Sequence, residues 1–355
     1  MFHHILVPLD GSERAEEALP LAAQLARSTG ASLLLLRVIP SERVYISLYP
    51  SVPGYMAEQI RRSFLEGAQA YLEHIVAKTH LEDIPIMLDA KIGIPGEVIV
   101  HVAREQLIDL VVMRSHGYTR VARFFFGSVA QHVARHSIVP VLVIRDGAST
   151  VMLQAERQVP APRLVVTLDG SSFAEEALVP ATQLAVALAS PQQGRVHLLC
   201  VIGQSILHDK EDAERHVQHD ALARAKAAAY LASVEERFRT GDLATYALSV
   251  TSSFSTYRRA NEIWQRIVDI GTSRKDECGQ AGNDIFAMTT HGRTGLQRLH
   301  YGSITEHVLD AARSPLLVVH AHIPVASMHG AQDQSKSRGE VLQRAAVQWD
   351  RILLA

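Results

Sequence analysis

The same pattern of buried strand, glycine turn and helix start occurs at two places in the sequence, and this duplication restricts the possible folds more than any other feature. The first place reads Met-Arg-Ser-His-Gly over residues 113–117 and Gly-Ser at residues 127–128. The second reads Met-Thr-Thr-His-Gly over residues 288–292 and Gly-Ser at residues 302–303, with the same nine-residue gap. Repeats this long are whole domains rather than solenoid units. The sequence therefore predicts two copies of one phosphate-binding unit.

The two copies also begin alike, with Leu-Asp-Gly-Ser at residues 9–12 and again at residues 168–171. The offset between the copies is 169 − 10 = 159 at the opening aspartates and 292 − 117 = 175 at the glycine turns. The second copy therefore carries 175 − 159 = 16 extra residues in its middle, and the polar stretch 272–283 is interpreted as an inserted, mobile surface loop. We expect one domain over residues 1–146, a linker over 147–162, a second domain over 163–321, and a tail over 322–355 with an amphipathic helix.

Composition is that of a soluble globular protein of ordinary charge. Of 355 residues, 47% are hydrophobic and 20% are charged, and the net charge is −2, so neither nucleic acid nor an anionic membrane surface is the expected partner. The two cysteines argue against a disulfide framework and against a cysteine-ligated metal. No basic segment precedes an apolar run, and no apolar stretch is long enough to span a bilayer, which predicts a cytoplasmic protein.

Short apolar runs alternate with amphipathic stretches along both copies. Because runs buried on both faces are typical of parallel strands, this alternation predicts an α/β, Rossmann-like fold with two doubly wound five-stranded parallel sheets. The expected strands cover residues 5–9, 33–39, 84–90, 110–113 and 141–144, then 164–168, 196–202, 244–250, 285–288 and 316–320. The expected helices lie between residues 12 and 30, around 60–76, and over 97–106 and 128–136, then over 173–189, 213–239, 261–270 and 303–312.

The glycine turns point to a ligand site at the carboxyl ends of the strands. Asp10 and Asp169 close first strands while Gly117 and Gly292 follow fourth strands, so adjacent first and fourth strands would bring them to one crevice. Glycines let a backbone approach a ligand closely, and free N–H groups at a helix start favour phosphate. The alternative is that these glycines only make a turn and a close helix contact.

The quoted strings, with Val-Pro-Leu-Asp-Gly-Ser at residues 7–12 and Met-Thr-Thr-His-Gly-Arg-Thr-Gly-Leu at residues 288–296, resemble the universal stress protein family. The resemblance covers nearly all of residues 1–146 and 161–321. It implies a tandem member with an adenine nucleotide alpha hydrolase-like fold and strand order 3-2-1-4-5 in each sheet. It also implies ATP as the ligand, through the motif Gly-x-x-Gly-(x9)-Gly-Ser/Thr, and leaves open whether magnesium accompanies the ATP.

Carried over by position, the resemblance puts Asp10 and Val38 on the adenine and ribose side, and Gly117, Gly127 and Ser128 at the phosphates. The contacts that it implies in copy one are Pro8, Leu9, Asp10, Val38, Met113, Arg114, His116, Gly117, Gly127, Ser128 and Val129. Those in copy two are Thr167, Leu168, Asp169, Val201, Met288, Thr289, His291, Gly292, Gly302, Ser303, Ile304 and Thr305.

Both copies depart from the family pattern at its first glycine, which is Arg114 in copy one and Thr289 in copy two. A side chain at this position would crowd the site. Two interpretations of Arg114 stay open at this stage: it reaches toward a phosphate, as a guanidinium group readily does, or it points away and pairs with a neighbour.

Other titratable residues give weaker indications. His116 and His291 suit turn shaping or a hydrogen bond near the phosphates, because no serine–histidine–aspartate arrangement accompanies them. Asp10 and Asp169 could be nucleophiles or metal ligands, yet the further acidic pair and lysine of such sites are not evident, so a backbone or ribose contact is favoured. We expect no catalytic residue and no metal ligand.

The last strand of each copy, Pro-Val-Leu-Val-Ile at 140–144 and Pro-Leu-Leu-Val-Val at 315–319, is apolar and unprotected at a sheet edge. The resemblance implies that this strand forms a dimer contact, which a tandem chain could satisfy internally as a pseudo-dimer. The alternative is that the tail helix or a loop covers each edge, and a homodimer of the whole chain also stays open.

The primary functional hypothesis is an ATP-binding stress-response regulator or chaperone-like protein, with slow nucleotide turnover at most. The alternative is a nucleotide-free interaction and dimerisation module whose pockets are closed by Arg114 and Thr289. A nucleotide hydrolase is disfavoured because the sequence lacks the lysine-containing phosphate loop Gly-x-x-x-x-Gly-Lys.

Overall fold

The structure is a computed structural model, which describes residues 1–41, 54–115, 127–145, 161–203, 213–257, 262–272, 284–290, 303–312 and 314–321. Most of the expected linker and the whole tail over 322–355 lie outside the described residues, as do Cys278 and most of the stretch 272–283. Within the described part, each half of the chain forms one five-stranded unit of the same topology.

All strands within a half run parallel, in the order third, second, first, fourth, fifth, as the resemblance implied. The first half contains β1 (His4–Leu9), β2 (Ser32–Pro40), β3 (Ile86–Gly93), β4 (Leu110–Arg114) and β5 (Val141–Ile144). The second half contains β6 (Arg163–Leu168), β7 (Gly194–Gly203), β8 (Leu248–Tyr257), β9 (Asp284–Thr289) and β10 (Leu316–Val319). The first and fourth strands of each half are therefore neighbours, as the crevice argument required.

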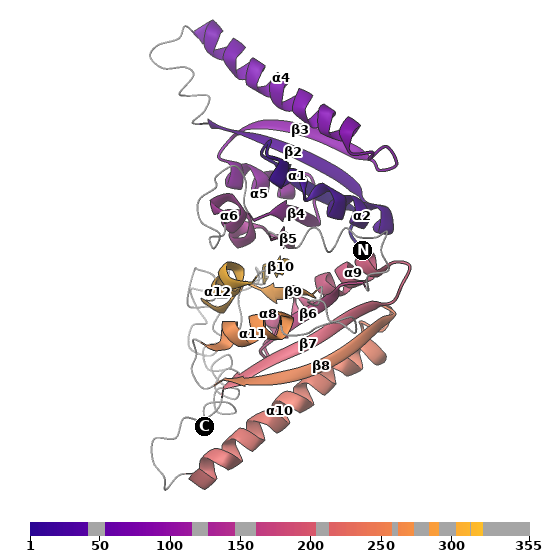
Figure 1. Cartoon of the computed structure of the whole chain (residues 1–355), viewed down its shortest axis with the longest axis vertical. Helices are drawn as coiled ribbons and strands as arrows, with labels where there is room; N and C mark the ends of the chain where they lie inside the picture. Colours follow the sequence, from indigo (N-terminus) through magenta and orange to yellow (C-terminus); the bar gives the residue numbers. More distant parts are fainter. Residues whose placement is uncertain are drawn as a thin grey trace, which may run out of the picture.

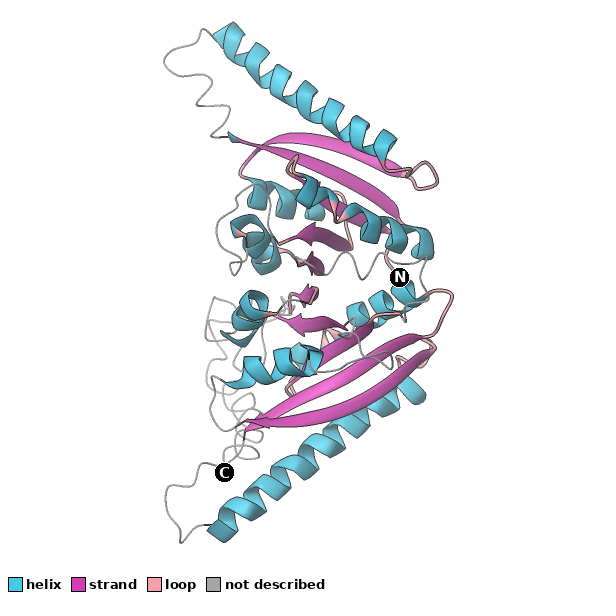
Figure 2. Cartoon of the chain, viewed as in Figure 1, coloured by secondary structure: helices cyan, strands magenta, loops and turns pink. Residues whose placement is uncertain are grey.

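The two expected sheets are halves of one ten-stranded sheet. Strands β5 and β10 pair antiparallel, with Leu142 opposite Leu317 and Val143 opposite Leu316. All four side chains are buried. Two apolar edge strands thus cover each other inside one chain, which is the pseudo-dimer expected from the sequence. Figure 1 shows the halves stacked about this junction, and Figure 2 shows the sheet continuing through it.

Helices cover both faces of the sheet. On one face, called here the α2/α9 face, lie α1 (Glu13–Glu16), α2 (Leu19–Thr29), α4 (Gly54–Lys78), α8 (Ser172–Glu175), α9 (Leu178–Ala189) and α10 (Ala213–Arg239). On the opposite face, called the α6/α12 face, lie α5 (Pro95–Glu105), α6 (Ser128–His136), α11 (Ile263–Thr272) and α12 (Ser303–Ala311). Each face has one apolar cluster that includes residues of both halves. Helices α4 and α10 lie at opposite ends of the molecule (Figure 1).

The first helix of each half is broken, whereas the sequence predicted a continuous helix. Ser12 and Ser171 cap the short helices α1 and α8, and their hydroxyl oxygens accept the Ala15 and Ala174 N–H groups at 3.1 Å. The break follows because Pro20 and Pro180 have no N–H group to continue the helical bonding from the preceding turn.

The predicted bounds of the third strand were wrong in the second half. The expectation was residues 244–250, but β8 runs from Leu248 to Tyr257. It continues because its whole length pairs with β7, from Gly194 opposite Leu248 to Gly203 opposite Tyr257.

Strand register also shows where the sixteen extra residues of the second half lie. The offset is 250 − 86 = 164 at the third strands and 285 − 110 = 175 at the fourth, so eleven of them lie between β8 and β9, where the sequence placed the insertion.

Two polar contacts between the halves flank the β5–β10 junction, one on each face of the sheet. On the α2/α9 face the Gln24 side-chain amide donates to the Leu188 carbonyl at 3.4 Å. On the α6/α12 face Arg135 of α6 forms an ion pair with Glu306 of α12. Strand pairing, core and side-chain contacts therefore join the halves. Within the described ranges, no helix is long and apolar enough to cross a membrane.

The junction predicts energetic coupling between Leu142 and Leu317. Each truncation to alanine removes a fully buried side chain and should lower the free energy of unfolding by about 2–5 kcal/mol. The double variant should lose less than the sum, by at least about 0.5 kcal/mol, because each side chain faces the cavity left by the other. Urea unfolding followed by circular dichroism measures this. Leu72→Ala combined with Leu317→Ala is the control and should be additive, because Leu72 lies in α4, which packs on β2 and β3, at least four strands from β10.

Candidate functional site

The loop after the first strand has the same geometry in both halves. Asp10 Oδ1 accepts the Ser12 N–H at 2.9 Å and the Ser12 hydroxyl at 2.6 Å. Asp169 makes the same two bonds to Ser171, at 3.0 and 2.6 Å. Gly11 and Gly170 between them have φ of +80° and +83°, a conformation that only glycine adopts without strain. These bonds hold each carboxylate against the loop, which suits a positioning or contact role better than that of a nucleophile.

Most apolar side chains of the predicted site come together on the α6/α12 face. In the first half Val38, Met113 and Val129 belong to the apolar cluster of that face. In the second half Val201, Met288 and Ile304 belong to the same cluster. Pro8 and Thr167 lie on this face by strand alternation, whereas Leu9 and Leu168 are buried on the opposite face. Each half thus has an apolar wall at the carboxyl ends of its first, second and fourth strands.

The two helices that were predicted to meet phosphate, α6 and α12, start beside the end of the fourth strand of their half. The Gly127 N–H donates to the Ser115 carbonyl at 2.8 Å, so the residue just before α6 lies next to the residue that follows β4. In the second half the buried Thr305 hydroxyl donates to the Thr289 carbonyl at 3.0 Å and joins α12 to β9. His116, Gly117, His291, Gly292, Gly302 and the Ser303 side chain lie outside the described residues.

Arg114 pairs with neighbours, which decides between the two interpretations left open by the sequence. Its guanidinium group lies 2.9 Å from the Glu17 carboxylate and donates to the Arg145 carbonyl at 2.8 Å. Successive side chains of a strand point to opposite faces, so Arg114 shares the α2/α9 face with Val112, while Met113 lies on the α6/α12 face. The side chain that replaces the first motif glycine therefore points away from the apolar wall.

Thr289 repeats this arrangement in the second half. Side chains alternate along β9, and Met288 lies on the α6/α12 face. Thr289 therefore lies on the α2/α9 face, as Ala287 does. Neither replacement strains the backbone, because among the described non-glycine residues only His80 and Leu107 have positive φ. The first motif glycine is therefore dispensable for backbone conformation at both positions.

The halves differ in the second strand, beneath the aspartate loop. The Arg37 guanidinium group lies 4.9 Å from the centre of the Tyr71 ring, and its Nη1 is 2.3 Å from where a Cβ at position 11 would be. By strand register the second-half counterpart of Arg37 is Cys200, and a Cβ at position 170 would meet nothing within 4 Å. The α2/α9 face therefore carries two guanidinium groups beside the first site, where the second half has Cys200 and Thr289.

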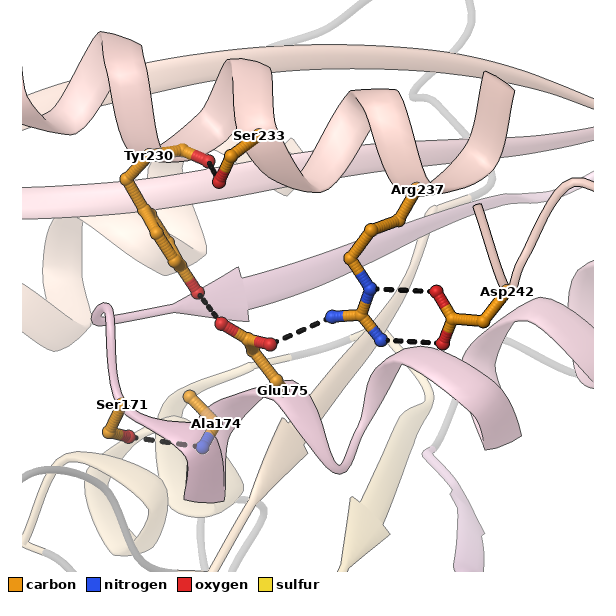
Figure 3. Close-up of polar contacts among 7 residues, drawn as sticks. All are labelled: Ser171, Ala174, Glu175, Tyr230, Ser233, Arg237 and Asp242. Carbon is orange, nitrogen blue, oxygen red and sulfur yellow. Dashed lines mark hydrogen bonds and ion pairs between the residues drawn. The ribbon is translucent and has the colours of Figure 1, made fainter. Parts of the chain in front are cut away.

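A partly buried network that the sequence analysis missed joins the first helix of each half to its long helix. The Tyr71 hydroxyl donates to Glu16 at 3.1 Å, and Lys78 lies 3.3 Å from the same carboxylate. In the second half Tyr230 donates to Glu175 at 3.0 Å and Arg237 lies 2.8 Å from it (Figure 3). The spacings are 55 and 62 residues in both halves. The repeated spacing of glutamate, tyrosine and basic residue is the sequence signal for this network. It is hard to recognise because the three residues lie far apart in the sequence.

Burial and the adjacent carboxylates raise the pKa of Tyr71 and of Tyr230 well above the ordinary tyrosine value. Desolvation is the largest cause in both, followed by the charge of Glu16 or Glu175. The network thus keeps the tyrosines protonated as donors. It also holds α4 and α10 against α1 and α8, the helices that continue from the aspartate loops.

A shallow groove of about 270 Å³ between α5 and α6 lies outside the predicted site. It is lined by Glu97, Val100, His101, Arg104, His132 and His136. Burial and the neighbouring His136 lower the pKa of His132, which favours the neutral ring. The part of the chain that the structure describes contains no group of three or more histidine, cysteine or acidic side chains arranged to hold a metal.

The tyrosines predict a stability loss at high pH. Their folded-state pKa is raised, so the stabilisation is complete below about pH 10, the ordinary tyrosine value, and is lost as the pH rises above it because only the unfolded chain releases these protons. Tyr71→Phe with Tyr230→Phe should make this decline shallower and should cost about 1 kcal/mol per site at pH 8. Urea unfolding at pH 8 and 10.5 compares the variants. Tyr55→Phe, at an exposed tyrosine of α4, should leave the free energy of unfolding unchanged at both pH values.

Comparison with known sequences agrees with the duplicated architecture. The model of the universal stress protein family matches residues 1–145 and 161–320. Universal stress protein Sll1388 of Synechocystis is 34% identical over 148 residues, which cover 40% of this chain and 96% of that protein. Universal stress protein MJ0577 of Methanocaldococcus jannaschii is 31% identical over 157 residues, which cover 41% of this chain and 96% of that protein. Each of these relatives is therefore as long as one half of the chain.

Solved structures of similar fold span both halves. A universal stress protein from Archaeoglobus fulgidus covers 90% of this chain and 96% of its own, with a TM-score of 0.53 and 17% identity. A protein of unknown function from Pseudomonas aeruginosa, PA1789, covers 90% of this chain and 93% of its own, with a TM-score of 0.57 and 13% identity. At these identities the likeness concerns the fold.

Proposed function

Because this chain belongs to the universal stress protein family and contains two of its domains, we propose that it binds ATP or a related adenine nucleotide at up to two sites. In this proposal it acts as a nucleotide-dependent stress-response regulator or chaperone-like protein. The observation that supports it most is the direction of the two departures from the family motif. Arg114 and Thr289 lie on the α2/α9 face, and the apolar wall and helix start on the other face stay clear of them.

Each half contains parts that fit such a ligand. The base and sugar would lie against the apolar wall, Val38 and Met113 in the first half and Val201 and Met288 in the second, near the aspartate loop. The phosphates would meet the N–H groups at the starts of α6 and α12, where the helix dipole favours an anion. Magnesium, if it accompanies the nucleotide, would neutralise phosphate charge.

The alternative of a nucleotide-free dimerisation module is less well supported. The strand that such a module would use, β5 or β10, is already paired within the chain. A hydrolase is also less well supported, since Asp10 and Asp169 accept hydrogen bonds from their own loops, which suits a positioning role better than that of a nucleophile. We therefore propose slow turnover at most.

Titration calorimetry with ATP and magnesium tests the proposal, with up to two bound nucleotides as the expected result. Gly127→Val and Gly302→Val should each weaken one site at least tenfold without unfolding the chain, because a branched side chain would stand between the phosphates and the helix start. Gly67→Val in α4 is the matched control, because a Cβ there meets nothing within 4 Å. Unchanged affinity in both site variants would show that the phosphates bind elsewhere, and no binding by the folded parent would end the proposal.

Restoring the family glycine gives a second, opposite test. Arg114→Gly should not raise nucleotide affinity, because the Arg114 side chain lies on the far face and leaves the apolar wall clear. It should lower the free energy of unfolding by about 1–3 kcal/mol through loss of the buried guanidinium contacts. Calorimetry and urea unfolding give the two values. An affinity gain of tenfold or more would mean that Arg114 obstructs the site.

A further inference from the structure

The ion pair between Arg135 and Glu306 joins the two halves of the chain. It lies at α12, the helix whose start belongs to the proposed second site. Arg135 lies in the last turn of α6, in the first half. Glu306 lies in the first turn of α12, in the second half. Their side chains are 30% and 39% exposed, so both are partly withdrawn from water at the junction.

This carboxylate belongs to the second half only. With the offset of 175 that holds from the fourth strand onward, the first-half counterpart of Glu306 is Gln131, which is neutral. A negative side chain in the first turn stabilises a helix by itself, because it faces the positive end of the helix dipole. The same charge opposes a second anion at that end. The helix start of the second site therefore carries a charge that would repel phosphate, and the first does not.

We infer that Arg135 is a positioning residue for the second nucleotide site, supplied by the first half to neutralise Glu306. The inference rests on the proposed function and deepens it, because it makes one site depend on a residue from the other domain. Arg135 would raise the affinity of the second site through charge, without touching the ligand. The effect is moderate, because both side chains are partly solvated and salt screens their field.

The experiment isolates the second site with Gly127→Val and measures MgATP binding by calorimetry at low ionic strength. In that background Arg135→Gln should weaken binding about three- to tenfold, because it leaves the Glu306 charge uncompensated at the helix start in a partly solvated setting. Adding Glu306→Gln should restore the affinity, Arg135→Lys should largely retain it, and added salt should shrink the effect of Arg135→Gln. A merely structural role for Arg135 would show neither the rescue nor the salt dependence.

Arg27→Gln is the matched control, because it removes an arginine from another ion pair, between α2 and Asp83 in the segment that leads into β3. It should leave MgATP affinity unchanged. One-site binding that Arg135→Gln does not alter overturns this inference and leaves the proposed function standing. Loss of affinity in Arg135→Gln that Glu306→Gln fails to restore also overturns it. If the starting chain binds no MgATP at all, the proposed function fails first and this inference fails with it.

Discussion

The antiparallel pairing of β5 with β10 is the contact on which the rest of the architecture depends. Each half alone would end in an apolar strand with unpaired N–H and C=O groups, a surface that proteins have to cover. Pairing these two edges makes one sheet of ten strands and lets the apolar cluster on each face run through both halves. It also brings α6 and α12, the helices whose starts form the proposed sites, within ion-pair distance of each other.

Within this frame the two halves share a scaffold and differ in charge. The aspartate loop and the tyrosine–glutamate network recur in both halves. The loop joins the first strand of each half to its first helix, and the network joins that helix to the long helix, α4 or α10. The differences fall beside the proposed sites. The first half has Arg37 and Arg114 where the second half has Cys200 and Thr289. It has Gln131 where the second half has Glu306. Duplication has kept the packing while the electrostatics have diverged, so equivalent folds need not bind one ligand equally.

Much of the fold was predictable from the sequence, and the exceptions have physical causes. Buried parallel strands are short apolar runs that can be recognised locally, and the parallel order of each half followed from the family resemblance. The break before Pro20 was missed because the apolar spacing continues across it, and the end of β8 was missed because pairing with β7, rather than local pattern, extends that strand to Tyr257. Most apolar members of the candidate site share one face of the sheet, but Leu9 and Leu168 lie on the other face, and the network around Glu16 was not predicted.

The sequence alone determined the duplication, the α/β class, the family resemblance and the segments proposed for the site, because these reside in local periodicity and in motifs with fixed spacing. Only the tertiary structure decided that the two sheets are one, that Arg114 turns toward Glu17, and that Arg135 meets Glu306. Each of these depends on which face a side chain occupies and which distant strand or helix lies opposite it. Such relations arise only when the chain has packed, since residues 171 positions apart share no local signal.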